Sequence, residues 1–145
     1  MADLVTLPPE TLGGVIDTVP FSRRFQLIPD VFGRMDSLLG QAGIFFAGPQ
    51  TALYRVDGDD MEIRIGVPLP KPLPGFQMFD VDAARALHIR HHGAFDTLPR
   101  IYQALTAEVE ARDLTRTGWA REVYRFMAKD ASLNICDVYM DVAQT

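Results

Sequence analysis

The chain has 145 residues, with 19 acidic against 14 basic side chains and a net charge of −5. This balance argues against nucleic acid or an anionic membrane surface as a partner, because both attract basic patches. The one cysteine, Cys136, excludes an internal disulfide and a zinc site made of cysteines. There is no apolar run of the ~18 residues that a membrane span needs, and no signal-peptide pattern at the N-terminus. We therefore expect a cytoplasmic protein that folds as a single domain over residues 1–145.

The first half of the chain predicts a strand, a helix and a β-hairpin. Val15, Ile16 and Val19 indicate the first strand, and apolar residues at helical spacing indicate a helix with Asp30 as its N-cap. The sequence Asp-Gly-Asp-Asp at residues 57–60 is typical of a hairpin turn. The predicted elements are a strand over residues 11–19, a loop over 20–29, a helix over 28–42, and strands over 51–56 and 61–67.

The second half repeats this order after a stiff connector. Prolines at every second position from 68 to 74, followed by Gly75, exclude a strand or a helix there. Further on, Asp96 or Thr97 is expected to cap a long helix, with Pro99 tolerated in its first turn. The predicted elements are a strand over residues 84–90, a turn over 91–94, a helix from 96 or 97, a strand over 121–127, a turn over 128–131 and a strand over 133–142.

The two halves match at a nearly constant offset, which indicates a duplicated β-α-β-β unit. We place the first repeat at about residues 4–67, the connector at 68–75 and the second repeat at about 80–142. The fold class is therefore α+β: an antiparallel sheet, two long helices on one side of the strands, and a ligand cleft where the repeats meet, across the other side. The matched pairs are Phe25 and Phe95, Phe32 and Tyr102, Gly48 and Gly118, and Tyr54 and Tyr124, each 70 residues apart, with Ile63 and Ile135 separated by 72.

One carboxylate stands out against this repeat. Strand geometry puts Glu122, Tyr124 and Phe126 on one face, with Trp119 just before the predicted strand. A carboxylate among aromatic rings is costly to bury unless a cation or a proton meets it. Since Ala52 stands at the matching position of the first repeat, Glu122 is an addition to a symmetric frame. The alternative is an ordinary surface carboxylate, or a partner of Arg121 or Arg125.

These motifs, taken in order, resemble the gyrase-inhibitor-like (GyrI-like) small-molecule-binding family, which is also the effector-binding domain of multidrug-sensing bacterial regulators. The resemblance covers nearly the whole chain from Leu4 onward. The residues that carry it are Gly48-Pro49 with Tyr54, Gly66-Val67-Pro68-Leu69-Pro70, His92-Gly93-Ala94-Phe95 with Leu98 and Tyr102, Arg121-Glu122-Val123-Tyr124, and Asp137-Val138-Tyr139-Met140.

The resemblance implies a duplicated β-α-β-β (SHS2-type) fold that binds lipophilic, aromatic and often cationic compounds between its halves. It further implies that Glu122 is the pocket carboxylate. Trp119, Tyr54, Tyr124 and Tyr139 are the candidate aromatic walls, although each ring could instead belong to the core. The chain departs from the family's commoner His-x-Gly-Pro-Tyr turn, because Ala94-Phe95 stands there.

Three functions follow, in order of preference. The first is a stand-alone binding protein for xenobiotics. The second is a metal-independent hydrolase of cyclopropane-type genotoxins, with Glu122 as general base and Tyr54 as proton donor. The third is a protein-interaction module, for example a gyrase-binding inhibitor that uses the acidic surface. DNA gyrase and a second copy of the chain are the candidate protein partners. We expect no cofactor.

The histidines and the cysteine are expected to be structural. His88, His91 and His92 do not have metal-ligand spacing, so no metal site is predicted. His92 is expected to bond the backbone in the turn before Gly93. Cys136, inside an apolar strand, is expected to be a buried and inert thiol.

Overall fold

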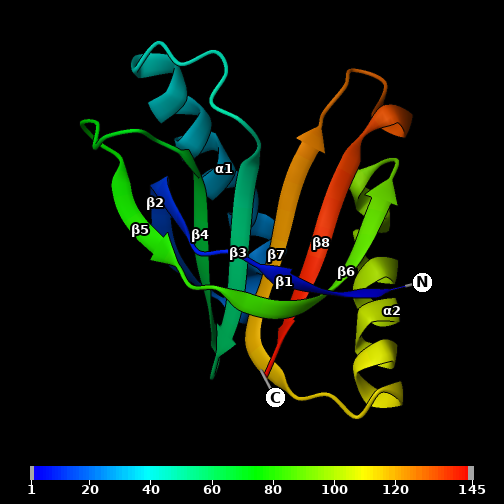
Figure 1. Cartoon of the computed structure of the whole chain (residues 1–145). Coiled ribbons are helices and arrows are strands. Elements are labelled where there is room, and N and C mark those ends of the chain that lie inside the picture. The colour runs from blue at the N-terminus through cyan, green and yellow to red at the C-terminus, as the bar shows by residue number, and fades with distance from the viewer. Residues whose placement is uncertain (1, 144–145) are drawn as a thin grey trace. The chain divides into compact units, whose positions relative to one another are not determined.

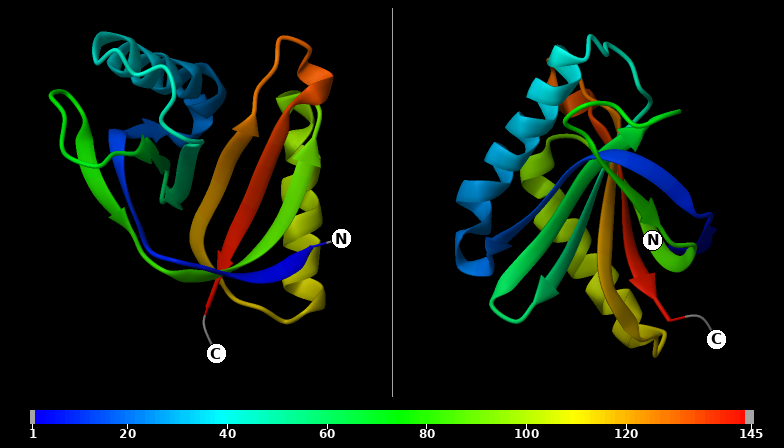
Figure 2. Two further views of the ribbon diagram at one scale, coloured as in Figure 1. Left: turned by 45° about the horizontal axis from the view of Figure 1, so that its top comes forward. Right: turned by 90° about the vertical axis from the view of Figure 1, so that its left-hand side faces the viewer.

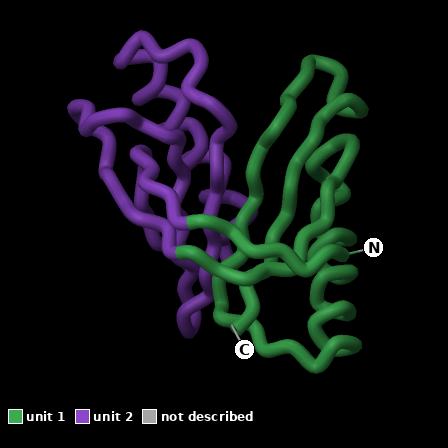
Figure 3. The backbone as a smooth tube through the Cα atoms, in the orientation of Figure 1, with its two compact units in different colours: residues 1–8, 83–145 green, residues 9–82 purple. Residues whose placement is uncertain are grey.

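The structure is a computed structural model that describes residues 2–143, and it divides into two compact units (Figure 3). Unit 2 is Pro9–Asp82, and unit 1 is Met1–Pro8 with Ala83–Thr145. The strands are β1 (Asp3–Leu7), β2 (Glu10–Pro20), β3 (Gln50–Asp57), β4 (Asp60–Pro68), β5 (Gln77–Val81), β6 (Ala84–His92), β7 (Arg116–Phe126) and β8 (Ile135–Val142). The helices are α1 (Arg24–Gln41) and α2 (Leu98–Ala111), and short 3-10 turns cover Phe21–Arg23, Phe95–Thr97 and Ala131–Leu133.

Each unit combines four antiparallel strands with one long helix. In unit 1 the strand order is β1-β6-β8-β7, and α2 covers one face of this sheet (Figure 1). In unit 2 the order is β3-β4-β2-β5, and α1 lies against β2 and β4. The predicted α+β class, with antiparallel strands and two long helices, is confirmed. The predicted ligand cleft between the repeats stays a prediction.

The repeats exchange their first strands. β1 precedes β2 in the chain but pairs with β6, as in the register pair Val5 with Ala86. β5 precedes β6 but pairs with β2, as in the pair Leu12 with Phe79. Each repeat is therefore β-β-α-β-β, one strand longer than expected. The residues that the sequence assigns to an entry segment are partly a strand, and so are those just after the connector.

The first helix begins earlier than the sequence predicts. α1 starts at Arg24 and has Pro29 inside it, so the predicted loop over residues 20–29 and the N-cap at Asp30 are wrong. Pro29 lacks an N–H and so leaves only the carbonyl of Phe25 without its helical partner, close to the helix start. Under the 70-residue offset Pro29 corresponds to Pro99, which lies in the first turn of α2. α1 therefore carries an extra N-terminal turn.

The core of unit 1 lies between α2 and the sheet. Leu98, Leu105 and Val109 of α2 contact Leu87 of β6 and Val138 of β8, and all of them are buried. In unit 2, Val31 and Met35 of α1 are buried, and so are Ile63 and Ile65 of β4 and Val15 of β2, which share one face of the sheet. Because each helix buries an apolar stripe at helical spacing, its position follows from the sequence pattern.

Candidate functional site

Glu122 lies on the face of the unit 1 sheet that α2 covers. Its register partner on β8 is Val138, which belongs to the core under α2. Residues that face each other across two strands point to the same side, so the carboxylate points toward the helix. Figure 2 shows α2 running along this side of the sheet. The expectation that the site lies on the side away from the helices is therefore wrong for Glu122.

Two tyrosine hydroxyls hold the carboxylate of Glu122. Tyr102, on α2, donates a hydrogen bond to Oε2. Tyr124, two residues further along β7, donates to Oε1. Phe95 packs against the Tyr124 ring, with ring centroids 5.2 Å apart and a tilt of 57°. The carboxylate is thus fixed from the helix and from its own strand, and its neighbours on both sides are aromatic.

Among the residues that the structure describes, Glu122 is buried without an ion-pair partner, whereas the buried Asp137 and Asp141 both have one. Only 7% of the residue is exposed, and within residues 2–143 no arginine, lysine or histidine forms an ion pair with it. Burial raises the pKa of Glu122 above its usual value, and the hydrogen bonds from Tyr102 and Tyr124 offset only part of that rise. The group is therefore a buried carboxyl that holds its proton more tightly than an ordinary glutamate does.

Tyr102 is the part of this arrangement that the sequence pattern does not reveal. Its place in the apolar stripe of α2 marks it as a core residue, and that stripe does not show which hydroxyl reaches a carboxylate. The repeat contains the missing signal. At the three matching positions unit 2 has Phe32, Ala52 and Tyr54, so unit 1 differs by a carboxylate and by the hydroxyl that bonds it.

The other predicted site residues, Tyr139, Trp119 and Tyr54, lie on three different strands. Tyr139 pairs with Arg121 in register and stacks on His88, with ring centroids 4.7 Å apart. It therefore lies on the opposite face of the sheet from Glu122, and this register counts against its predicted role as a wall. Trp119 is half-buried on β7, inside the strand rather than before it, and Tyr54 is half-buried on β3 of unit 2. Their roles stay predictions.

The opposite face of the unit 1 sheet has a network of charges around Asp137. This carboxylate is 1% exposed and accepts hydrogen bonds from Arg90 and Arg125, and His88 lies 2.8 Å from it. Burial alone would raise the pKa of Asp137, but the hydrogen bonds from Arg90, His88 and Arg125 outweigh it and hold the pKa well below its usual range. Beside this network, Arg121 forms a buried two-bond ion pair with Asp141.

The histidine and cysteine predictions have different outcomes. His91, at 8% exposure, lies 2.9 Å from the Ala94 carbonyl and 2.8 Å from the Thr97 hydroxyl, so the turn role predicted for His92 belongs to it. Residues 2–143 contain no group of acidic, histidine or cysteine side chains that could hold a metal ion. Cys136 is buried, as predicted, and burial is the largest of the causes that raise its thiol pKa to about 12. An inert thiol stays a prediction.

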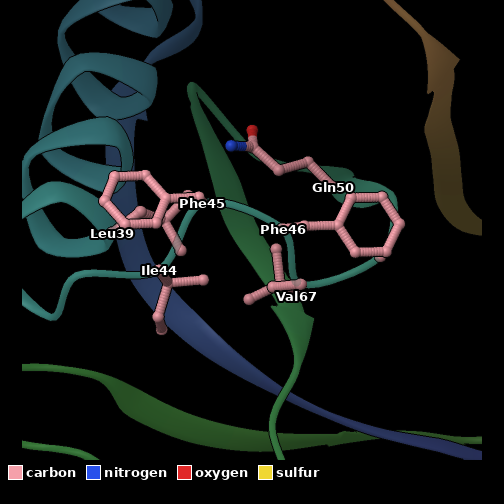
Figure 4. A pocket seen from close by; sticks show the side chains of 8 residues that line it. Leu39, Ile44, Phe45, Phe46, Gln50 and Val67 are labelled. Atoms are coloured by element: carbon pink, nitrogen blue, oxygen red, sulfur yellow. The ribbon is translucent and has the colours of Figure 1, made fainter.

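A small apolar pocket lies in unit 2, where the loop after α1 passes over β4 (Figure 4). Its volume is about 160 Å³. Phe45 and Phe46 belong to it, although 98% and 92% of these residues remain exposed. None of its lining residues is charged, so it cannot neutralise an ionic ligand. The lining residues are Leu39, Ile44, Phe45, Phe46, Ala47, Gly48, Gln50 and Val67.

Comparison with known proteins shows the fold. No family model matches the sequence, and no curated protein sequence matches it. Among solved structures, SAV2435 bound to tetraphenylphosphonium has a TM-score of 0.79 at 15% identity, over 99% of this chain and 94% of that one. The C-terminal domain of EcmrR has a TM-score of 0.70 at 21% identity, over 100% and 98% of the two chains. A hydrolase from Listeria innocua has a TM-score of 0.62 at 7% identity, over 98% and 91%.

Each match covers almost the full length of this chain and of the solved structure, so the chain shares one fold with all three proteins. The fold agrees with the effector-binding fold that the sequence motifs imply. In the described part of the chain, no helix is long and apolar enough to cross a membrane.

Proposed function

We propose that the chain is a small-molecule-binding domain in which Glu122 receives a lipophilic, aromatic cation. One observation carries the proposal: a carboxylate with 7% exposure has two neutral phenols as hydrogen-bond donors and, within residues 2–143, no ion-pair partner. A buried charge without a counterion is costly. A bound cation would supply the missing countercharge.

The donors already present favour a particular class of cation. Each oxygen of Glu122 accepts a hydrogen bond from a tyrosine, Oε2 from Tyr102 and Oε1 from Tyr124. A ligand therefore does not have to donate a hydrogen bond of its own. Quaternary ammonium and phosphonium ions fit this requirement, because they carry charge without an N–H group. Their aromatic or alkyl groups would contact the neighbouring rings.

The structural neighbours support the same class. SAV2435 has this fold and was solved with tetraphenylphosphonium, a cation that carries four phenyl rings. The EcmrR C-terminal domain also has this fold. The low identities carry no residue roles to this chain, so the assignment of Glu122 rests on its own surroundings.

The test compares a cation with a neutral compound of similar shape. Trp119 is the only tryptophan and lies three residues before Glu122, so its fluorescence can report binding. Methyltriphenylphosphonium and neutral triphenylphosphine oxide are titrated into the native protein and into Glu122→Gln. Two unit charges ~4 Å apart attract by about 4 kcal/mol at an effective dielectric of 20, before desolvation. We expect E122Q to reduce the affinity for the cation by about tenfold or more, which is ~1.4 kcal/mol. The affinity for the neutral compound should change little.

The matched control is Glu110→Gln, which removes the same charge from an exposed position on α2. It should leave both affinities unchanged. If E110Q and E122Q lose the same affinity for the cation, cation binding depends only on the net charge of the protein. Equal loss of cation and neutral compound in E122Q would mean that the variant damages packing, and either result contradicts the proposal.

A hydrolase is the second candidate, and one observation favours it. A buried carboxyl whose pKa is raised suits proton transfer, and Glu122 has that shift. The Listeria innocua hydrolase has the same fold. In this case Glu122 would act as general base on water, with Tyr54 as the predicted proton donor. Mass spectrometry of a cyclopropane-containing compound after incubation separates the two functions, since hydrolysis adds one water to the compound and binding leaves its mass unchanged.

A further inference from the structure

The face of the unit 1 sheet opposite α2 holds two arginines on a single carboxylate. Arg90 of β6 donates from Nε and Nη2 to the two oxygens of Asp137, at 2.8 and 2.9 Å. Arg125 of β7 donates from Nε to Oδ2 of the same carboxylate, at 2.9 Å. Asp137 lies on β8, between these two strands (Figure 1). Both guanidinium groups are therefore anchored to one buried point.

This cluster has more positive than negative charge. Asp137 contributes one negative charge and the two arginines contribute two positive charges, before His88 is counted. The positive groups are also the accessible ones: 51% of the Arg90 side chain and 42% of the Arg125 side chain are exposed, whereas only 2% of the Asp137 side chain is. Within residues 2–143 Arg90 uses Nε and Nη2 for its hydrogen bonds to Asp137, so the N–H groups of Nη1 are left for a ligand. A local excess of positive charge therefore faces solvent on a chain whose net charge is −5.

The anchoring matters because it reduces the cost of binding. A mobile arginine side chain loses rotamer freedom when it binds an anion, and this loss weakens binding. An arginine that Asp137 already holds has lost much of that freedom before the anion binds. Guanidinium groups form paired hydrogen bonds to carboxylate and phosphate oxygens. Both groups bond Oδ2 of Asp137, so they lie next to each other, and their remaining N–H groups can contact one further oxyanion.

An exposed apolar surface adjoins the arginines on the same face. Ile135 is two residues from Asp137 on β8, so its side chain points to the same side. Its register partners are Phe126 on β7 and His92 on β6. A register shift between Tyr124 and Phe126 moves Phe126 off the face of Glu122, where simple strand alternation predicts it. Phe126 is 51% exposed, and Ile135 is half-buried. A ring and an aliphatic side chain therefore lie two register positions beyond Asp137.

We propose that Arg90, Arg125 and Phe126 form a binding site for a carboxylate that carries an apolar group, such as an aryl carboxylic acid. The carboxylate would bridge the two guanidinium groups, and the apolar group would cover Phe126 and Ile135. This site is separate from Glu122, which lies on the opposite face of the same sheet. It does not depend on the function proposed for Glu122.

The experiment titrates 1-naphthoate into the 15N-labelled native protein and follows the backbone amide signals of β6, β7 and β8. Arg125→Gln and Arg90→Gln should each reduce the affinity for 1-naphthoate by about fivefold or more, because each variant lacks one guanidinium group. Phe126→Ser should weaken it as well and leave inorganic phosphate unaffected. Thermal unfolding of each variant checks that it is folded, and Arg125→Lys, which keeps the charge but loses the fork, should recover only part of the affinity.

The matched control is Arg100→Gln, which removes an exposed arginine from α2 on the other side of the sheet. It should bind 1-naphthoate as the native protein does. The proposal is overturned if the native protein shows no saturable shifts in β6, β7 and β8. It is also overturned if R100Q loses as much affinity as R125Q, or if phosphate binds as tightly as 1-naphthoate.

Discussion

The two phenols on Glu122 decide how the carboxyl behaves. Tyr102 and Tyr124 each donate to one oxygen, and both bonds favour the ionised form, while burial disfavours it and prevails. The result is a carboxyl that is held in place and still unusually basic. A group of this kind can pair with a cation or carry a proton, and the same geometry therefore supports both proposed functions.

Removing one phenol should cost more stability while Glu122 is ionised than while it is protonated. Tyr124→Phe takes away a donor to a buried charge, which is worth about 1.5–3 kcal/mol. We expect that loss in urea unfolding at pH 8 and a smaller loss at pH 4, where the carboxyl is protonated. In a Glu122→Gln background the additional loss from Y124F should shrink. An equal loss at both pH values would show that the hydroxyl matters through packing alone.

At the residue scale, the sequence identifies the charge but not its partners. Glu122 is recognisable because the matching residue of the first repeat is Ala52. Tyr102 is recognisable only by comparison with Phe32 of the first repeat, because a tyrosine in the apolar stripe of a helix has the same pattern whether or not its hydroxyl reaches an acid. His91 and His92 are neighbours with equal chemistry, and only the direction of β6 decides which one is buried.

At the scale of elements, local signals predict the helices and hairpins well. The hairpin at Gly58, the strands around it and the position of α2 all agree with the sequence patterns, because their contacts are close in the chain. β1 and β5 are missed. Each has five residues and pairs with a strand far away in the sequence, so no local pattern marks them. The start of α1 is missed because Pro29 looks like a helix boundary.

Two glycines should respond to alanine in opposite ways. Gly33 is exposed in the middle of α1, and a Cβ there would have no neighbour within 4 Å, so Gly33→Ala should stabilise the protein by about 1 kcal/mol. Gly14, on β2, has no such space. Its Cβ would lie 1.9 Å from the Ile65 carbonyl oxygen, so Gly14→Ala should destabilise by about 3 kcal/mol or more. Chemical denaturation measures both, and a stable G14A protein would contradict the close approach of β2 and β4.

At the scale of the whole molecule, the chain is a duplication whose repeats exchange a strand. β1 belongs to the sheet of unit 1, and the Ala2 carbonyl accepts a hydrogen bond of 2.6 Å from Arg112, next to the end of α2. The N-terminal segment therefore stabilises a unit formed mainly by the second half of the chain. No sequence pattern reveals this exchange, because it depends on pairing across about 80 residues.

Deleting residues 2–8 tests the exchange. Hydrogen exchange should become faster in β6, which loses its edge partner, while β2 should keep the protection that β4 and β5 give it. Amide exchange measured by mass spectrometry on peptides from residues 10–20 and 84–92 gives the comparison. Faster exchange in residues 10–20 with no change in residues 84–92 would show that β1 belongs with its own repeat.

The proposed function depends on the asymmetry between the repeats, because only the second repeat has a carboxylate at the matched position. This carboxylate also makes the stability of the fold depend on pH. Because the pKa of Glu122 is raised by folding, the folded state holds this proton more tightly than the unfolded state does. The stability that it contributes is complete below the ordinary pKa of about 4.3. It is lost as the pH rises through the raised value. Affinity for a cation should change in the other direction, increasing as the carboxyl ionises.

The most direct measurement is therefore the pKa of Glu122, with and without a cation. The carboxyl carbon is followed by 13C NMR in protein labelled at glutamate, assigned with Glu122→Gln, over a pH titration with and without methyltriphenylphosphonium. We expect a pKa above the usual value of about 4.3 in the free protein and a clear fall when the cation binds. A pKa at or below that value in the free protein, or one that the cation leaves unchanged, would contradict this expectation.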